Sequence, residues 1–461
     1  MNNGLLPSRT PGCIPLIPVA ESEFDAWLER QDESLRRWLA ATGFKAKPGS
    51  FNLVSSPDGQ LQRVVAGIAS ADDLWALGGL PANLPEGDYV LDAVLEPRQR
   101  ERLTLGWALG AYQFTRYKAP KRTMARLALD PACDAGRIQR QVKSVALARD
   151  LINTPAEDLM PEHLAEATQA LGREFGATVE QIVGDELLAH NFPVIHAVGR
   201  ASAHPPRLLD LRWGDPAHPK ITLVGKGVCF DSGGLDLKPA SAMRLMKKDM
   251  GGAATVLGLA RLIMSSGLPV RLRALIAAVD NAVAGNAFRP GDVLRSRQGL
   301  TIEIHNTDAE GRLILCDALT EAGSEPPAVM LDFATLTGAA RVALGTEVPA
   351  LFCNDEMLAA DLLAAAEREQ DPFWRLPLHQ PYREMLDSKI ADLANASESS
   401  YAGAITAALF LKEFVPAGMP WAHFDLMAWN LKTQPGRPEG GEAMALRAVF
   451  GWLEQSYGGS G

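Results

Sequence analysis

Long apolar runs, paired cysteines and a basic amino terminus are all missing from this sequence. No stretch of the 461 residues approaches 18 consecutive apolar residues, so we expect no membrane-spanning helix and no membrane partner. The five cysteines are widely spaced and form no C-x-x-C pair, so we expect reduced thiols in a cytosolic protein. Because the first residues also lack the basic region of a signal peptide, a cytoplasmic location is expected.

Several common site motifs are missing as well. The chain has no H-E-x-x-H motif, and its eight histidines are scattered. It contains neither a complete G-x-G-x-x-G nor a G-x-x-x-x-G-K-[ST] sequence, which argues against a dinucleotide site and a P-loop. A formal net charge of −10 argues against nucleic acid as a partner of the chain as a whole.

The larger part of the chain alternates between strand-like and helix-like segments. The pattern predicts strands at 220–224, 271–279, 300–304, 329–333 and 350–353, and helices at 253–264, 313–322 and 357–369. Such alternation predicts an α/β fold whose larger domain has a mostly parallel sheet with helices on both faces.

Two domains are expected from the length and the composition, which is 47% hydrophobic. Residues 1–130 are predicted to form a small N-terminal α/β domain without chemistry of its own. It would contain an amphipathic helix at 21–42, a strand at 61–68 and an aromatic helix at 107–117. Residues 131–461 are predicted to form the second domain, which opens with a linking helix at 137–153.

The most highly charged turn of the second domain follows the expected strand at 300–304. Residues 306–313 read NTDAEGRL, and helical periodicity resumes after Gly311. Asp308 and Glu310 therefore lie at a strand-to-helix turn, where open α/β sheets bind ligands. Two like charges held so close require a cation between them or a proton on one of them. The alternative for such a pair, taken alone, is a capped turn that faces water.

A second charged segment follows the expected strand at 220–224. It reads GKGVCFDSGGLDLKP and carries Lys226, Asp231 and Lys238 among glycines, which allow the backbone to approach a ligand closely. A helical stretch with the sequence KKDMGGAA comes next and carries Asp249. Because the two charged segments follow different strands, we expect them to converge at one edge of the sheet.

The strings VGKGVCFDSGGLDLKP, KKDMGGAA and NTDAEGRL resemble the three signature segments of the leucyl (cytosol) aminopeptidase family, and their mutual spacing matches too. Supporting matches are NTPA at 153–156, TLTGA at 335–339 and GAITAA at 403–408. The similarity covers roughly residues 130 to 455. It implies a dimetal exopeptidase with an additional N-terminal domain.

The resemblance implies that two divalent metal ions share one site, which is formed by Lys226, Asp231, Asp249, Asp308 and Glu310. Asp231 and Glu310 would bridge the ions. Asp308 would complete one metal site, and Lys226 with Asp249 would complete the other. This set of hard ligands favours Mn²⁺, Zn²⁺ or Mg²⁺.

The implied reaction removes the N-terminal residue, Leu-like by preference, from a peptide with a free N-terminus, by means of a water that the two metals activate. Lys238 would stabilise the gem-diolate, and Arg312 would hold a bicarbonate that takes the proton of the water. The backbone around Leu336 would help to hold these anions. Because the substrate amine must be neutral, an alkaline pH optimum is expected.

Family analogy also places the substrate side chain near apolar or small residues that suit a Leu or Met side chain, namely Met246, Thr335, Gly338, Leu426 and Met427. Leu336 is a further candidate for substrate binding. Asp236 could pair with Lys238, or it could hydrogen-bond backbone within its own turn. The family further implies a homohexamer whose active sites face an enclosed cavity.

Two other functions stay open from the sequence. The first is a catalytically weak family member that acts as a scaffold or DNA-binding protein. The second is a different amidohydrolase that uses the same metals on dipeptides or modified amino acids. All seven signature residues are present, and a scaffold under no catalytic demand would be free to lose at least one, so the aminopeptidase is favoured.

Overall fold

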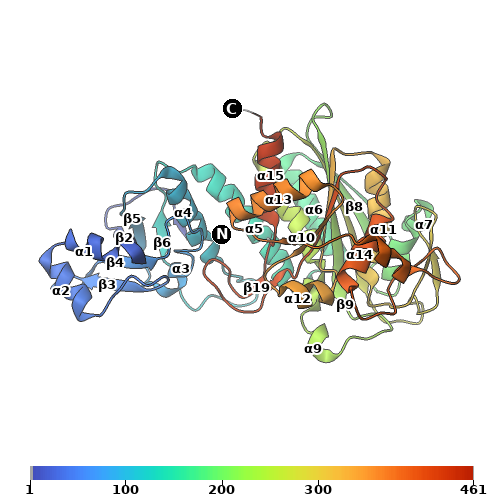
Figure 1. Ribbon diagram of the computed structural model, residues 1–461, viewed down its shortest axis with the longest axis horizontal. Coiled ribbons are helices and arrows are strands. Elements are labelled where there is room, and N and C mark those ends of the chain that lie inside the picture. The colour runs from blue at the N-terminus through green and yellow to red at the C-terminus, as the bar shows by residue number, and fades with distance from the viewer. Residues whose placement is uncertain (1–3, 460–461) are drawn as a thin grey trace. The chain divides into compact units, whose positions relative to one another are not determined.

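The computed structural model describes residues 4–459, which pack as two compact units (Figure 1). The first unit comprises the described residues up to Lys143 together with Lys432–Glu439. The second comprises Ser144–Leu431 together with residues 440–459. Helix α5 (Ala135–Asn153) runs across the boundary between the units. The return of 432–439 to the first unit has no signal in the sequence, and the division at residue 130 stays a prediction.

The first unit is built on a six-stranded sheet with the order β1-β6-β5-β2-β4-β3. All of its neighbouring strands run parallel except the hairpin of β3 and β4. Its strands are β1 (Leu5–Leu6), β2 (Ile14–Ala20), β3 (Phe51–Ser55), β4 (Leu61–Ile68), β5 (Asp88–Leu91) and β6 (Arg126–Ala128). Its helices are α1 (Phe24–Glu29), α2 (Glu33–Ala41), α3 (Leu80–Asn83) and α4 (Pro97–Gly110), with the 3₁₀ turn η1 (Glu21–Glu23) before α1.

Two helix predictions in this unit differ from the structure. The single helix expected at 21–42 is broken into η1, α1 and α2, because the Asp32 side chain accepts a hydrogen bond from Leu35 N and starts a new helix there. The helix expected at 107–117 is the end of α4, which stops at Gly110. The strand expected at 61–68 coincides with β4.

The second unit is built on an eight-stranded sheet with the order β15-β14-β17-β13-β9-β10-β8-β7. Its centre, β17-β13-β9-β10, is parallel, and antiparallel pairs lie toward both edges. The strands are β7 (Thr178–Val183), β8 (Arg207–Trp213), β9 (Lys220–Asp231), β10 (Arg271–Asn281), β13 (Val329–Ala334), β14 (Ala350–Cys353), β15 (Trp374–Arg375) and β17 (Trp421–Asp425).

Helices cover both faces of this sheet (Figure 1). Val224 of β9 packs in a cluster with residues of α8 (Pro193–Gly199), α11 (Glu310–Ser324) and α14 (Gly403–Lys412). The next residue, Gly225, faces α10 (Gly251–Ser265), which packs against α6 (Pro161–Phe175) and α15 (Leu446–Tyr457). Because successive strand residues point to opposite faces, the two helix groups lie on opposite sides, and the predicted α/β fold class is confirmed.

The remaining helices are short or peripheral to this core. They are α7 (Glu186–Ala189), α9 (Ala240–Met243), α12 (Gly338–Leu344) and α13 (Glu356–Glu369), with the 3₁₀ segments η2 (Ala156–Asp158), η3 (Met246–Met250) and η4 (Gln380–Leu386). Within residues 4–459, no helix is both long and apolar enough to cross a membrane.

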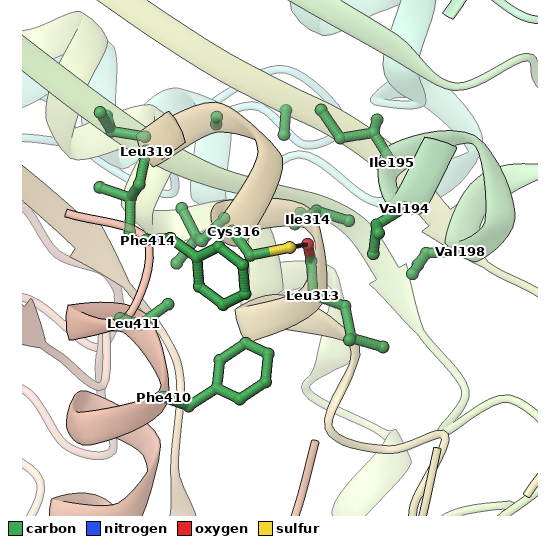
Figure 2. Close-up of a cluster of buried hydrophobic side chains, with 14 of the residues drawn as sticks. Val194, Ile195, Val198, Leu313, Ile314, Cys316, Leu319, Phe410, Leu411 and Phe414 are labelled. Atoms are coloured by element: carbon green, nitrogen blue, oxygen red, sulfur yellow. Dashed lines mark hydrogen bonds between the residues drawn. The ribbon is translucent and has the colours of Figure 1, made fainter. Parts of the chain in front are cut away.

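The core on the α11 face fixes the position of the helix that follows the NTDAEGRL turn. Figure 2 shows Phe410 of α14, Phe414 just after that helix and aliphatic side chains of α8 around Cys316 of α11. The Cys316 thiol donates to Leu313 O at 2.9 Å, and it is completely buried. Phe410 and Phe414 pack with ring centroids 5.2 Å apart. Burial of these side chains stabilises α11 in place, because each contributes about 1.5–3 kcal/mol when removed from water.

A small separate sheet carries the strand that precedes the NTDAEGRL turn. β12 (Thr301–Glu303) pairs with β11 (Val293–Arg295) and with β16 (Leu393–Ala394), and not with any strand of the eight-stranded sheet. The expectation that both charged segments follow strands of one sheet is therefore wrong. A pattern of alternating apolar residues identifies a strand but not its partner. A further two-stranded ribbon joins β18 (Trp429–Asn430) and β19 (Gly440–Gly441).

We predict that Arg149→Ala lowers the free energy of unfolding by about 3–5 kcal/mol. Arg149 binds both carboxylate oxygens of Glu442, at 3.0 Å and 2.9 Å, and both side chains are buried. Removal of the guanidinium would leave a buried charge without its cation. Thermal and urea unfolding of the two proteins at neutral pH measure the loss.

The exposed pair Arg37–Glu33 provides the matched control, because Arg37→Ala should change stability by less than about 1 kcal/mol. Burial opposes the charge of Glu442, but Arg149 and Asn430 hold the pKa of that carboxyl below its usual value. The contribution of the pair is therefore present at neutral pH and is lost as the pH falls through the folded-state pKa. A difference between wild type and Arg149→Ala that stays constant down to about pH 3 would contradict this account.

Candidate metal centre

The first seven residues of the segment GKGVCFDSGGLDLKP are part of a strand and not of a loop. β9 continues through Lys226 to Asp231, several residues beyond the expected end at 224, and pairs with β10 as far as Asp231. The two glycines within β9, Gly225 and Gly227, serve close packing. A Cβ at Gly225 would lie 2.8 Å from Cα of Ala253 in α10. β9 therefore delivers Lys226 and Asp231 from a rigid, paired backbone.

Lys226 lies between two carboxylates from different elements. Its Nζ is 2.6 Å from Asp249 Oδ2 in η3 and 2.9 Å from Glu310 Oε1 at the first residue of α11. Nζ also donates to Thr335 O at 2.8 Å. A Cβ at Gly311 would approach Lys226 Cε to 2.6 Å, so the glycine after Glu310 makes room for the lysine.

Lys238 lies between the other two carboxylates. Its Nζ is 2.7 Å from Asp231 Oδ2, and it forms a second ion pair with Asp308. Carboxylate oxygens of Asp231, Asp308 and Glu310 all come within 4.8 Å of one another. The seven residues singled out in the sequence thus include six that converge here, with Arg312 two residues farther along α11.

The electrostatics reflect this crowding of negative charge. Burial and the neighbouring Asp231 raise the pKa of Glu310 to about 8. The same two causes raise the pKa of Asp308 to about 6. Burial alone would lower the pKa of Lys226, but Asp249 and Glu310 outweigh it and hold that pKa above its ordinary value. A site that raises the pKa values of its acids attracts cations.

The residues present fit divalent metal ions. Asp249 Oδ2, Asp308 Oδ1 and Glu310 Oε1 are buried and accept no well-aligned hydrogen bond, although lysine nitrogens lie within ion-pair distance of each. Buried carboxylate oxygens normally accept hydrogen bonds or bind metals. Four carboxylates and one amine are the hard donors that Mn²⁺, Mg²⁺ and Zn²⁺ accept.

Arg312 is separate from the carboxylate cluster in its contacts. Its Nη1 donates to Asn395 O at 2.8 Å, and its Nε has no hydrogen-bond partner. Within residues 4–459 it forms no ion pair with a carboxylate, and burial lowers the pKa of its guanidinium to about 10. A buried cation with a free donor is suited to binding an anion.

The residues expected around the substrate side chain lie beside the same cluster. Met246 is the first residue of η3, which also carries Asp249, and Gly338 is the first residue of α12. Thr335 Oγ1 donates to Asp249 Oδ1 at 2.8 Å, so it also holds a predicted metal ligand. The N–H of Leu336 donates to Asp425 Oδ1 at 2.9 Å, so this amide is already engaged.

Four residues of the centre escaped the sequence analysis: Asn281, Thr307, Asn395 and Asp425. Asn395, just after β16, accepts from His305 N and Asn306 N, which are 90 and 89 residues away in sequence, and so holds the NTDAEGRL turn. Thr307 is inside the signature string, which was the one available signal. The others are single polar residues at strand ends, which no local pattern distinguishes from solvated ones.

Two side chains near the centre have contacts that the sequence left open. Asp236 Oδ2 accepts from Thr307 N at 2.8 Å, so it holds backbone, while Lys238 pairs with other acids. Lys248 is almost completely buried, and burial lowers the pKa of its ammonium to about 8.

Comparisons with known proteins show what this chain is similar to. The cytosol aminopeptidase family catalytic domain matches residues 146–450, and the M17 aminopeptidase N-terminal domain matches residues 14–130. A probable cytosol aminopeptidase of Syntrophotalea carbinolica is 42% identical over 398 residues, which cover 82% of this chain and 78% of the relative. One of Nocardia farcinica is 38% identical over 444 residues, which cover 90% and 87%.

Solved structures give the same result. The cytosol aminopeptidase of Coxiella burnetii is 50% identical, with a TM-score of 0.95 over 99% of this chain and all of that chain. The bottromycin maturation enzyme BotP in complex with Mn is 34% identical, with a TM-score of 0.87 over 96% of this chain and 99% of that chain. The chain belongs to the cytosol aminopeptidase (M17) family, and it is a metallo-aminopeptidase.

Proposed function

We propose that this aminopeptidase removes Leu-like residues from the N-termini of peptides, at a dimetal site formed by Lys226, Asp231, Asp249, Asp308 and Glu310. One observation carries the proposal. Oxygens of Asp231, Asp308 and Glu310 converge within 4.8 Å, next to the cluster of Lys226 and Asp249. Carboxylates that converge in this way are the means by which two-metal hydrolases hold both ions.

The metal ions that we propose are Mn²⁺ or Zn²⁺, with Mg²⁺ as a further candidate, and the Mn complex of BotP supports manganese. Asp231 and Glu310 would serve both ions, Asp308 would serve one ion, and Lys226 with Asp249 would serve the other. Lys226 binds as a neutral amine, so four carboxylates balance two divalent ions. Since its neighbours hold the pKa of Lys226 high, metal binding releases a proton.

When bound, the metals supply Lewis acidity, which makes a water nucleophilic near neutral pH and polarises the scissile carbonyl. Lys238 places an ammonium at the oxygen where negative charge develops and stabilises the tetrahedral intermediate. Arg312, whose Nε has no hydrogen-bond partner, would hold bicarbonate, which would supply the base for the proton of the water. Leu336 contributes backbone to this region, although its own N–H is bound to Asp425.

The substrate side chain contacts the surface formed by Met246, Thr335, Leu336 and Gly338. Met246 and Leu336 offer apolar surface, and Gly338 leaves space, which together suit a branched aliphatic side chain. We further propose a cytoplasmic homohexamer, which the family resemblance implies and a mass measurement in solution tests.

We predict that the purified protein cleaves Leu-p-nitroanilide and does not cleave its N-acetylated counterpart. Activity should be lost on removal of metal and should return with Mn²⁺. The rate should rise with pH to about 8–9, because the α-amine, with a pKa near 7.7–8.0, must be neutral to bind. A panel of aminoacyl-p-nitroanilides with and without Mn²⁺ provides the measurement.

Each outcome of this panel is informative. Turnover of N-acetylated substrates would contradict the exopeptidase proposal and would favour a different amidohydrolase that uses the same metals. Failure of every metal to restore turnover would favour the scaffold or DNA-binding alternative. A rate that falls between about pH 6 and pH 8 would contradict the need for a neutral amine.

We expect Asp308→Ala to lower kcat/KM by about a thousandfold, roughly 4 kcal/mol of transition-state stabilisation, and to leave the fold intact. The bound metal, measured by elemental analysis, should fall from two ions toward one per chain. Asp361→Ala, on the exposed face of α13, removes a carboxylate outside the site and serves as control. Full activity in Asp308→Ala would refute the metal assignment.

The role of Arg312 predicts a dependence on bicarbonate. In buffer depleted of carbon dioxide, the wild-type rate should rise on addition of bicarbonate, because the anion supplies the general base, a contribution of about 10²–10⁴-fold. Arg312→Met should lose both the rate and the response. If Arg312→Met keeps a response of wild-type size, another group binds the anion.

A further inference from the structure

The two oxygens of Asp231 have different surroundings. Oδ1 accepts hydrogen bonds from Gly233 N at 2.9 Å and from Asn281 Nδ2 at 2.8 Å. Oδ2 faces the centre, 2.7 Å from Lys238 Nζ. Two donors in place around Oδ1 occupy its lone pairs, so only Oδ2 is available to a cation.

An irregularity in the sheet brings Asn281 to this carboxylate. β9 and β10 pair in parallel up to Val228 and Val279, and the register then shifts so that Asp231 lies opposite Asn281. β9 therefore has one residue more than β10 over this interval. Such bulges re-aim side chains at strand ends. Without the shift, Asp231 and Asn281 would not be cross-strand partners.

The Asn281 side chain is itself held in one orientation. Its Nδ2 donates both to Asp231 Oδ1 and to Thr307 O at 3.2 Å, so the amide nitrogen must face these two acceptors. Its backbone carbonyl accepts from Ser232 Oγ at 2.6 Å. Asn281 is completely buried, and it contacts Ser232 of the loop after β9 through its backbone and Asp231 at the end of β9 through its side chain.

Thr307 connects the same amide to the second metal-binding segment. Its Oγ1 donates to Gly233 O at 2.7 Å and accepts from Asp236 N at 2.9 Å. Gly234 has φ +66°, and a Cβ there would come within 3.0 Å of both Asn281 Oδ1 and Thr307 Oγ1. The loop after β9 and the turn before α11 are thus locked together through Asn281 and Thr307.

We propose that Asn281, locked by Thr307, is a positioning residue that restricts Asp231 to metal binding through Oδ2 alone. The inference rests on the proposed metal site and goes beyond it, because it assigns a function to a residue that contacts no reacting group. A carboxylate with one oxygen fixed by protein donors cannot rotate to chelate a single ion with both oxygens. It stays oriented toward the space that it shares with Asp308 and Glu310.

If the Asn281 side chain had only a structural role, its loss would affect stability and metal affinity differently from the loss of a positioning residue. Loss of a structural hydrogen bond lowers stability and leaves metal affinity unchanged in the molecules that remain folded. Loss of a group that orients a ligand typically lowers metal affinity by about 10–100-fold. Metal affinity, measured apart from activity, therefore separates the two roles.

The test is isothermal titration of metal-stripped protein with Mn²⁺. We expect Asn281→Ala to bind Mn²⁺ about 10–100-fold more weakly than the wild type, with a loss of activity that shrinks at saturating Mn²⁺. Asn430→Ala is the matched control, because Asn430 is also buried and donates to a carboxylate, Glu442, outside the centre. This control should bind Mn²⁺ like the wild type even if it is less stable.

Substitution of Thr307 keeps the proposal testable if Asn281→Ala does not fold. Thr307→Val preserves the shape but removes the hydroxyl that contacts Gly233 and Asp236, and it should weaken Mn²⁺ binding. Thr307→Ser keeps the hydroxyl and should restore wild-type affinity. Mn²⁺ affinity within about threefold of the wild type in both Asn281→Ala and Thr307→Val would overturn the proposal. Absence of Mn²⁺ binding in the wild type would instead refute the metal site on which it rests.

Discussion

Mutual repulsion of buried carboxylates is the constraint on which the rest of this structure depends. Asp231, Asp249, Asp308 and Glu310 come from three segments of the chain and meet at one place. All except the partly exposed Asp308 are buried, where little water is available to screen them. Such an arrangement persists only if cations are supplied or protons are taken up. The chain itself supplies two ammonium groups, Lys226 and Lys238, and the remaining need for positive charge makes the site a binding place for metal ions.

Several contacts of the fold hold these carboxylates in fixed positions. Lys226 and Asp231 lie on the part of β9 that pairs with β10, so neither can move without disturbing that pairing. Glu310 begins α11, whose position is set by the apolar cluster around Cys316. Asp249 is held by Thr335, and the turn with Asp308 is held by Asn395. A dimetal site needs ligands fixed to a fraction of an ångström, and these contacts provide that.

Two oppositely charged side chains at the start of α11, Glu310 and Arg312, have different surroundings. Glu310 faces the metal ligands, while Arg312 is directed to Asn395 and keeps a free Nε. Burial acts on both residues, raising the pKa of the acid and lowering that of the base. The same low-dielectric surroundings suit both the metal that we propose at Glu310 and the anion that we propose at Arg312, because each buried charge lacks a full set of protein partners.

The sequence by itself determined the chemistry of this protein, whereas the tertiary structure decided its geometry. Signature strings such as NTDAEGRL identified the family, and the alternation of segments identified the α/β class, because both signals are local. Local patterns could not show that β9 extends through Asp231, that β12 belongs to a separate sheet, or that 432–439 returns to the first unit. Nor could they identify Asn281 or Asn395, whose importance comes from partners distant in the chain. Strand pairing and long-range hydrogen bonds depend on which segments meet in space, and only the folded chain settles that.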